Sequence, residues 1–350
     1  MNREIQLYIG LLKHGWSVSF ITYGDKSDLL YKKQLKGIDI YCNKFGLPHE
    51  WYKYLLYLLH RNVLKNCSLI KTNQMSGADV ASKIANKYNK KLINRMGYLL
   101  TDAIEKLPEF RTFDLDKVDK MQSDVFNKAN KIVVTTQQIL NRIKSNDNSL
   151  SEKISIIPNF VDIKLFSPAN MNQKYDIIFI GRISEQKNLE SLLKALKGSK
   201  YKILVIGNGI LKEKLLNEYG SDINIKWLDA IPNYDIPMYM NQSKLFILPS
   251  FYEGHPKILI EAMSCGMIVL ASNVEGNNEI IQDGINGFLC EPSAKNIEKT
   301  INEIFISSEG RLNKIKIAAR EYVAKRFSLK KIIDLELKLY ESVLNKSMTS

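Results

Sequence analysis

The sequence of 350 residues is poor in cysteine and contains no long apolar run. Its four cysteines, Cys42, Cys67, Cys265 and Cys290, lie far apart and form no C-x-x-C pair. Neither a zinc site nor a disulfide framework is therefore indicated, and a reducing compartment fits. No stretch approaches the ~20 apolar residues of a membrane-spanning helix, and the first residues do not read as a signal peptide. We expect a cytoplasmic protein, either free or peripheral on the inner face of a membrane.

The composition is otherwise that of a globular protein, with 45% hydrophobic and 25% charged residues. A chain of this length exceeds the size at which one core keeps growing, so two domains of roughly 150 to 200 residues are expected. The net charge of +13 is uneven, because residues 1–167 contain 26 basic and 16 acidic residues against 24 and 21 in the remainder. The basic front half favours an anionic partner such as membrane lipid, a phosphorylated acceptor or nucleic acid; a solvated lysine-rich surface explains it equally well.

Short apolar runs alternate with helical patterns along the chain, which predicts parallel sheets covered by helices on both faces. In the front half we expect strands at 17–23, 38–42, 69–73, 91–96, 131–136 and 153–157. In the rear half we expect them at 177–180, 203–206, 223–228, 245–248 and 268–271. The fold class is therefore α/β, with two doubly wound, Rossmann-like domains facing each other across a ligand-binding cleft.

The segment 158–162, followed by Pro168, interrupts this periodicity and indicates the linker between an N-terminal domain at 1–165 and a C-terminal domain at 166–328. The first predicted helix, at 3–13, precedes the first recognisable strand. A doubly wound domain ordinarily opens with a strand and a glycine-rich turn. We therefore expect that this strand and loop are missing, through truncation or a misassigned start.

The most informative stretch is 249–266, which follows a predicted buried strand and reads as strand, loop and helix. Pro256 suits the first helical position, where its missing N–H costs nothing, so the amides of 255–258 would point toward a ligand. Such amides and the helix dipole bind phosphate. Glu253 in the loop and Glu261 in the second helical turn then suit sugar and ribose hydroxyls. In the alternative interpretation, Glu253 is only an N-terminal charge and Glu261 belongs to a solvated face.

A second constellation follows the first strand of the rear half, where Gly181, Arg182 and Lys187 form a G-R-x4-K pattern. Preorganised Arg and Lys stabilise the charge that a diphosphate leaving group gains as its bond to a sugar breaks. Taken alone the pattern is weak, because surface cations are its usual explanation. Together with Glu253 and Glu261 it becomes a strong signal.

These residues resemble the retaining glycosyltransferases of family 4, whose E-x7-E motif matches Glu253 to Glu261 and whose G-R-x4-K motif matches Gly181 to Lys187. The linker at 157–168, the Gly-Asn-Gly at 207–209 and the segment 283–289 also match that family. The resemblance implies a GT-B fold in which the rear domain binds the nucleotide sugar and the front domain binds the acceptor. It also implies that a final helix, at 329–350, crosses back to the N-terminal domain.

For the site, the resemblance implies that Glu253 contacts the transferred sugar, Glu261 contacts the ribose, and Arg182 and Lys187 clamp the diphosphate. Glu253, Arg182 and Lys187 are thus the candidate catalytic residues. The candidate donor-binding residues are Gly181, Arg182, Lys187, Gly207, Asn208, Ile231, Glu253, Gly254, His255, Pro256, Lys257, Ile258 and Glu261.

The implied activity is metal-independent transfer of a sugar, with retained anomeric configuration, from a nucleoside-diphosphate-sugar to a glycan or lipid-linked acceptor. The implied context is assembly of cell-surface polysaccharide, lipopolysaccharide or glycolipid, with the basic N-terminal half against an anionic membrane and with no cofactor, metal or nucleic acid. The sequence departs from the family in four places. The glycine-rich loop after the first strand is not found, and residues 94–98 offer no His or Asp beside the reacting carbon. Phe160 stands in the linker where Gly is common, and Asp229 stands where many members have Gly.

Two weaker signals have competing interpretations. Residues 114–116 read D-x-D, the metal-binding pattern of another glycosyltransferase fold, but a chance match fits their charged surroundings better. The aromatic and basic residues at 49–66 could form a helix at a membrane interface. Alternatively, this helix packs a stripe of Leu55, Leu58 and Leu59 onto the front sheet.

Three rival functions are open. A sugar-nucleotide epimerase can share the scaffold, since fold alone does not fix function, but the arrangement of Glu253 and Glu261 argues against it. A nicotinamide-dependent dehydrogenase is disfavoured because no G-x-G-x-x-G opens a βαβ unit with an acid at the right distance. A non-enzymatic basic binding protein, for nucleic acid for example, rests on charge alone.

Overall fold

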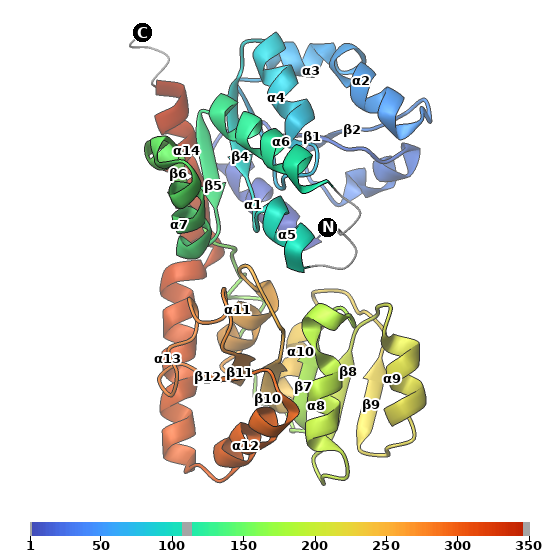
Figure 1. The fold of residues 1–350 in the computed structure, drawn as a ribbon, viewed down its shortest axis with the longest axis vertical. Helices are drawn as coiled ribbons and strands as arrows, with labels where there is room; N and C mark the ends of the chain where they lie inside the picture. The colour runs from blue at the N-terminus through green and yellow to red at the C-terminus, as the bar shows by residue number, and fades with distance from the viewer. Residues whose placement is uncertain (1, 107–113, 346–350) are drawn as a thin grey trace. The chain divides into compact units, whose positions relative to one another are not determined.

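The computed structural model describes residues 2–106 and 114–345, and the chain divides into two compact units (Figure 1). The front unit comprises residues 1–157 together with 332–350, and the rear unit comprises residues 158–331. The sequence placed the two divisions at 165/166 and 328/329. The end of the chain packs with its beginning, although residues 346–350 of the predicted final helix lie outside the described residues.

The front unit alternates short strands with helices. Its elements are, in chain order, α1 (Asn2–Lys13), β1 (Ser19–Ile21), η1 (Lys26–Lys33), β2 (Asp39–Tyr41), α2 (His49–Leu59), α3 (Arg61–Asn66), β3 (Leu69–Lys71), α4 (Ala78–Lys87), β4 (Lys91–Arg95), α5 (Leu100–Lys106), α6 (Leu115–Lys128), β5 (Lys131–Val134), α7 (Gln137–Asn146), η3 (Asn148–Lys153), β6 (Ile154–Ile156) and α14 (Leu329–Asn345). Each strand predicted in the front half is confirmed, and each lies within its expected range. None of the described helices is both long and apolar enough to span a bilayer.

The strands of the front unit form two separate parallel sheets, and not the single doubly wound sheet that the sequence predicted. One sheet is four-stranded, in the order β3-β4-β5-β6, and the other pairs β1 with β2. A doubly wound order needs a strand between β1 and β3. Because no strand among the described residues occupies that position, the hydrogen-bonded ladder is interrupted there.

The helix α2 packs through a face that the sequence did not predict. Its buried residues are Tyr52 and Leu56, which join an apolar cluster with α3 and α4. Leu58, which we expected in the packing stripe, is 51% exposed. The predicted stripe is therefore wrong at Leu58, whereas Leu59 does pack against the cluster; periodicity alone does not select the buried face of a helix with so many apolar and aromatic residues.

The rear unit repeats the alternation of strands and helices. Its elements are β7 (Tyr175–Ile180), η4 (Glu185–Lys187), α8 (Leu189–Leu196), β8 (Ile203–Ile206), α9 (Lys212–Tyr219), β9 (Ile225–Leu228), α10 (Ile236–Asn241), β10 (Ser243–Leu248), α11 (Lys257–Ser264), β11 (Ile268–Ser272), β12 (Phe288–Cys290), α12 (Ala294–Phe305) and α13 (Glu309–Phe327). The strands predicted in the rear half are confirmed. The strand β12 was not predicted from the sequence.

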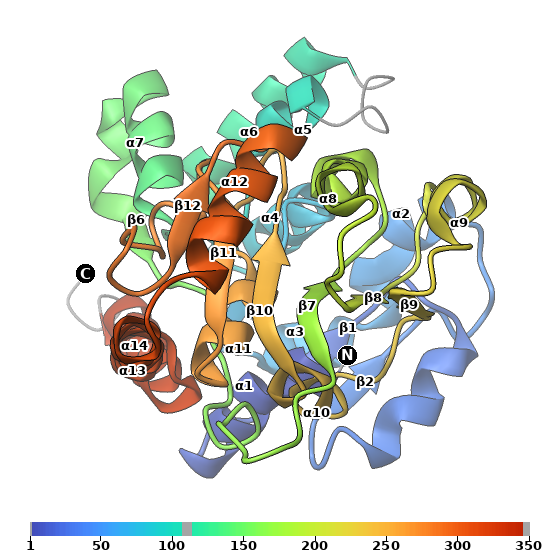
Figure 2. The same ribbon diagram turned by 90° about the horizontal axis from the view of Figure 1, so that it is seen from below.

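One six-stranded parallel sheet, in the order β12-β11-β10-β7-β8-β9, forms the centre of the rear unit (Figure 2). Residues of α10, α11 and α13 pack on one face of it, and residues of α8, α9 and α12 pack on the other. Along β7, Ile178 and Ile180 enter the first core, whereas Ile177 and Phe179 enter the second. This alternation is the two-residue period of a strand buried on both faces, so the predicted doubly wound architecture is confirmed for this unit.

A buried ion pair ties α14 to the sheet of the front unit. Lys71 in β3 donates to Glu336 Oε1 at 2.6 Å and to the hydroxyl of Tyr340 at 3.0 Å. The side chain of Lys71 is 10% exposed and that of Glu336 is 0% exposed. Burial lowers the pKa of Lys71, and the carboxylate of Glu336 acts in the opposite direction. Each charge therefore depends on the other to replace the water it has lost.

Glu336→Gln should destabilise the chain by about 3 kcal/mol, because Lys71 then keeps a buried charge without its counter-ion. The double variant Lys71→Met/Glu336→Leu should lose less, because it removes both charges and keeps apolar volume in their place. Urea unfolding followed by circular dichroism measures both free energies. A Glu336→Gln variant as stable as the parent would contradict this account of the pair.

Candidate functional site

The predicted site lies where the strand order of the rear sheet reverses. The strands β7 and β10 are neighbours, and the chain continues from β7 to β8 on one side and from β10 to β11 on the other. Open α/β sheets bind ligands at the carboxyl ends of the strands at such a point. The segments that leave these ends are 181–188 after β7 and 249–256 after β10. They are the two segments in which the sequence motifs lie.

Hydrogen bonds join the two segments to each other. The amide of Phe251 donates to the carbonyl of Gln186 at 2.9 Å, and the side chain of Gln186 donates to the carbonyl of Tyr252 at 3.1 Å. Asn188, with a left-handed φ of 51°, donates through its side chain to the carbonyl of Pro249 at 2.9 Å. Asn tolerates this backbone conformation better than most residues. The two segments thus hold each other in place.

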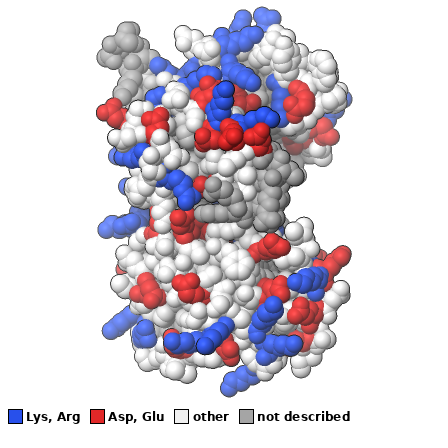
Figure 3. Space-filling model, viewed as in Figure 1, with Lys and Arg blue, Asp and Glu red and all other residues white. Residues whose placement is uncertain are grey.

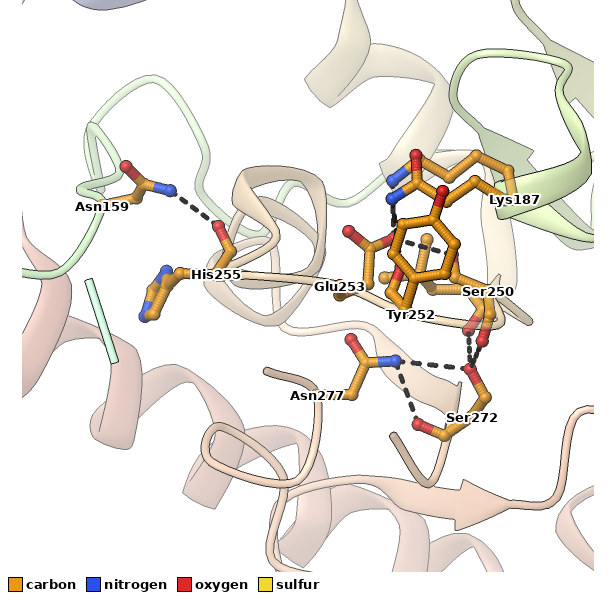
Figure 4. Close-up of polar contacts among 10 residues, drawn as sticks. Asn159, Lys187, Ser250, Tyr252, Glu253, His255, Ser272 and Asn277 are labelled. Atoms are coloured by element: carbon orange, nitrogen blue, oxygen red, sulfur yellow. Dashed lines mark hydrogen bonds and ion pairs between the residues drawn. The ribbon is translucent and has the colours of Figure 1, made fainter. Parts of the chain in front are cut away.

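The carboxylate of Glu253 is held by two donors (Figure 4). Its Oε1 accepts from Lys187 Nζ at 2.5 Å and from the hydroxyl of Ser250 at 2.7 Å. The side chains of Lys187 and Glu253 are 17% and 6% exposed, so water screens the pair only in part. The sequence assigned Lys187 to a diphosphate, and in the structure its ammonium lies on the Glu253 carboxylate.

The helix after Glu253 begins one residue later than predicted. Pro256 is its N-cap rather than its first residue, because its ψ of 111° is extended, and α11 starts at Lys257. No side chain caps this end of the helix, and an uncapped N-terminus favours anions. The side chain of Asn159 donates to the carbonyl of His255 at 2.6 Å, so the linker segment also holds this loop (Figure 4).

Glu261 lies in the second turn of α11 and is 1% exposed. Its Oε1 accepts from the side-chain amide of Asn233 at 3.3 Å. The interpretation of Glu261 as part of a solvated face is therefore wrong. A buried carboxylate on the helix that follows the Glu253 loop is consistent with a polar ligand there, and its assignment to ribose stays a prediction.

Two glycines allow backbone segments to touch at the site. A Cβ on Gly276, in the loop after β11, would lie 1.8 Å from the carbonyl oxygen of Gly254. A Cβ on Gly207, after β8, would lie 1.9 Å from the carbonyl oxygen of Gly181. Both glycines also have positive φ, 84° and 154°, which other residues rarely adopt. A larger residue at either position would force the predicted donor-binding segments apart.

The remaining candidate residues follow β8 and β9. Asn208 is exposed, and its side-chain oxygen accepts from Lys212 Nζ at 2.8 Å. Lys212 also forms an ion pair with Asp229, the residue that departs from the family pattern. Ile231 is half-buried against the core that contains α11. At the position where the sequence departs from the family, Asp229 is therefore paired with Lys212, a cation that the sequence analysis did not single out.

Arg182 is exposed and, unlike Lys187, forms no ion pair with any residue within 2–106 or 114–345. Sequence reasoning assigned no role to Ser250, Asn188 or Asn233, although each bonds a predicted residue or segment. All three are polar residues in a segment that follows a strand of the rear sheet, β7 for Asn188, β9 for Asn233 and β10 for Ser250. That position was the signal that could have identified them.

The D-x-D pattern at 114–116 has a structural role. Asp114 is the N-cap of α6, and its carboxylate accepts from the amide of Lys117 at 3.2 Å. Within the described ranges, no three His, Cys, Asp or Glu side chains come together as a group that could hold a metal ion. Metal independence itself stays a prediction.

Comparison with solved structures identifies the fold. Over 97% of its length the chain is similar to sucrose-phosphate synthase of Thermosynechococcus elongatus, with a TM-score of 0.84, 20% identity and 92% of that chain covered. It is also similar to Anabaena HepE in complex with UDP and glucose, with a TM-score of 0.78 and 18% identity over 97% of this chain and 94% of that one. At such identities the likeness shows the fold, and that fold is GT-B.

Sequence comparison finds relatives for part of the chain. Residues 162–322 match the family described as glycosyl transferases group 1. The chain is 30% identical over 220 residues to the UDP-Gal:alpha-D-GlcNAc-diphosphoundecaprenol alpha-1,3-galactosyltransferase of Escherichia coli. That match covers 55% of this chain and 56% of the relative, so the chain spans about half the length of such curated relatives. The rear part of the chain is thus similar to group 1 glycosyl transferases, and the chain has the GT-B fold.

Gly276→Ala should lower both the melting temperature and the affinity for nucleoside diphosphates, and Gly284→Ala should lower them far less. The two glycines have similar positive φ, 84° and 70°, but a Cβ on Gly284 meets nothing within 4 Å. The contrast therefore separates the clash with Gly254, worth roughly 1 to 3 kcal/mol, from the cost of the left-handed backbone. Thermal unfolding and calorimetry with UDP, GDP and ADP measure the two effects. Equal losses in the two variants would contradict the close packing of the loops.

Proposed function

We propose that this protein is a retaining glycosyltransferase that moves a sugar from a nucleoside-diphosphate-sugar, bound by the rear unit, to a glycan or lipid-linked acceptor. The proposal rests mainly on one observation. The two motif segments, 181–188 and 249–256, lie side by side where the strand order reverses, and Glu253 accepts hydrogen bonds there from Lys187 and Ser250. The family match of residues 162–322 supports it. The donor named for the Escherichia coli relative and the UDP bound to the Anabaena structure support a nucleotide sugar.

In the proposed reaction the bond between the anomeric carbon and the diphosphate oxygen breaks, and the diphosphate keeps the electron pair. The acceptor hydroxyl bonds to the same carbon on the face that the diphosphate leaves, which retains the configuration, and its proton passes to the departing diphosphate oxygen. Negative charge therefore grows on the leaving diphosphate, and a cation or helix N-terminus facing it lowers the barrier. Arg182 and the uncapped N-terminus of α11 are the groups that we assign to this role.

Lys187 can serve the sugar and the diphosphate together. An ammonium has three N–H donors, and one of them is on Glu253, which leaves two for phosphate oxygens. The same contact partly neutralises Glu253, so a carboxylate can accept hydrogen bonds from sugar hydroxyls beside an anionic donor. Glu261 is assigned to the ribose, and the Asn208 and Ile231 region to the base.

We further propose that the reaction needs no metal or cofactor and belongs to polysaccharide, lipopolysaccharide or glycolipid assembly. The cations named above supply the charge that a divalent metal would otherwise bring to a diphosphate. The context is supported by the lipid-linked diphosphate in the name of the Escherichia coli relative. The acceptor would bind to the front unit.

The proposal is tested by screening UDP, GDP, ADP and their sugars for a rise in melting temperature, and then following the best donor by NMR with glycan and lipid-linked acceptors. We expect one nucleotide to stabilise the protein and the product to keep the donor's anomeric configuration. The rate should be unchanged in EDTA. An inverted product would overturn retention, and loss of activity in EDTA with recovery in manganese would overturn metal independence. Absence of binding by every nucleotide would overturn the donor site.

Two variants should separate binding from turnover. Glu261→Ala should weaken donor binding by ~1.5 to 3 kcal/mol, because a buried charged acceptor is lost. Arg182→Ala should lower kcat more than it raises the donor KM, because its contact strengthens as charge develops on the leaving group. Lys314→Ala removes an exposed cation on α13 and serves as the control. Unchanged calorimetric affinity in Glu261→Ala, or an Arg182 effect no larger than the control, would contradict these assignments.

A further inference from the structure

The outer side of α2 carries a stripe of exposed apolar side chains. Trp51, Tyr54 and Leu58 are 64%, 70% and 51% exposed. Their spacing of three and four residues places them on one face of the helix, away from the buried Tyr52 and Leu56. Three large apolar side chains gathered within two helical turns need an explanation that a single exposed residue does not.

The exposed apolar residues of the rear unit are distributed differently. Ile210, Ile223 and Ile306 are 84%, 98% and 84% exposed, but they lie in three separate loops. Scattered residues of this kind are normal on a protein surface. In the front unit, by contrast, Phe45 adds a 73% exposed ring in the segment that leads into α2. Other exposed apolar residues of the front unit, such as Leu30 at 79%, lie on other segments, so α2 and the segment before it carry the group of neighbouring ones.

The surroundings of this stripe are cationic. No Asp or Glu occurs between Glu50 and Asp79 in the sequence, and Glu50 is itself paired with Lys53 at 2.9 Å. Arg61 and Lys65 are exposed on α3, which follows α2 directly. Figure 3 shows Lys and Arg side chains over the region in which Figure 1 labels α3.

We propose that the α2–α3 face docks the front unit on an anionic lipid bilayer; the face consists of Phe45, Trp51, Tyr54, Leu58, Arg61 and Lys65. Trp and Tyr have an apolar body and a polar tip, and they gather at the boundary between water and hydrocarbon. A helix with an apolar stripe and adjacent cations lies in the plane of that boundary. Each Lys or Arg near an anionic leaflet raises partitioning roughly fivefold.

Two other occupants fit the face less well. A second copy of the chain would bring Arg61 and Lys65 close to their own counterparts, and like charges oppose such pairing. A nucleic acid would satisfy the cations but offers no hydrocarbon layer for Leu58 and Phe45. Of the three partners, only an anionic bilayer offers hydrocarbon to the apolar side chains of the face and negative charge to its cations.

The test is co-sedimentation of the full chain with vesicles of phosphatidylcholine alone or mixed with phosphatidylglycerol. We expect binding to the mixed vesicles, weakened by salt. Trp51→Ser/Tyr54→Ser/Leu58→Ser should bind roughly tenfold more weakly or worse, because the apolar contact is lost. The control Ile210→Ser/Ile223→Ser/Ile306→Ser removes as many exposed apolar side chains from the rear unit and should bind like the parent. Quenching of tryptophan fluorescence by brominated lipid should fall in Trp51→Tyr.

A second variant, Arg61→Glu/Lys65→Glu, keeps the inference open to disproof if the triple variant fails to fold. It should lose binding to mixed vesicles while retaining the parent's melting temperature. Equal loss in the control variant, or full binding by the Arg61/Lys65 variant, would overturn the proposal. Concentration-dependent dimerisation that the triple variant abolishes would assign the face to a second copy instead. Lipid binding is measured without sugar transfer, so failure of the proposed enzymatic function would not affect this result.

Discussion

The pairing of β7 with β10 is the constraint on which the candidate site depends. The two strands are parallel and in register from Tyr175 opposite Ser243 to Ile178 opposite Phe246, so their carboxyl ends reach the same edge of the sheet. The chain continues from β7 toward β8 and from β10 toward β11, which lie on opposite sides of the pair. The segment after β7 therefore does not cover the segment after β10. Lys187 and Glu253, 66 residues apart in sequence, thereby come within 2.5 Å. No local feature of either segment would bring this contact about.

Around that contact the protein uses its own groups to order the loops. The side chains of Gln186 and Asn188 bond backbone carbonyls of the neighbouring segment, and Gly276 lets a third loop lie against Gly254. Groups fixed in this way need little reorganisation when a charged ligand arrives. An unpaired carboxylate at this position would repel an anionic ligand such as the proposed donor. Because Lys187 lies on the Glu253 carboxylate, much of that repulsion is cancelled.

The strands and the two motifs could be predicted because their signals are local. A strand buried on both faces, such as 203–206, is a continuous apolar run, and it was found where expected. The sequence led us to expect a missing first strand in the front domain, but the division of the front strands into two sheets was not predicted, since strand pairing is not encoded in one segment. The face of α2 was misassigned because its sequence is apolar on most sides, and packing with α3 and α4 decided that Tyr52 and Leu56 are buried. The partner of Lys187 was missed for the same reason, because it lies in a distant segment.

The attachment of α14 to the front unit has a consequence for how the protein is made. Residues 158–331 form the rear unit without interruption, so that unit can fold as soon as it has left the ribosome. The front unit is synthesised first, but its buried Lys71 lacks the carboxylate with which it pairs, that of Glu336, until the end of translation. The nascent front unit must therefore wait, incompletely packed, through the synthesis of the entire rear unit. A premature stop codon shortly before Glu336 would leave the front unit incompletely packed, although it is synthesised first. The rear unit, residues 158–331, would still be complete.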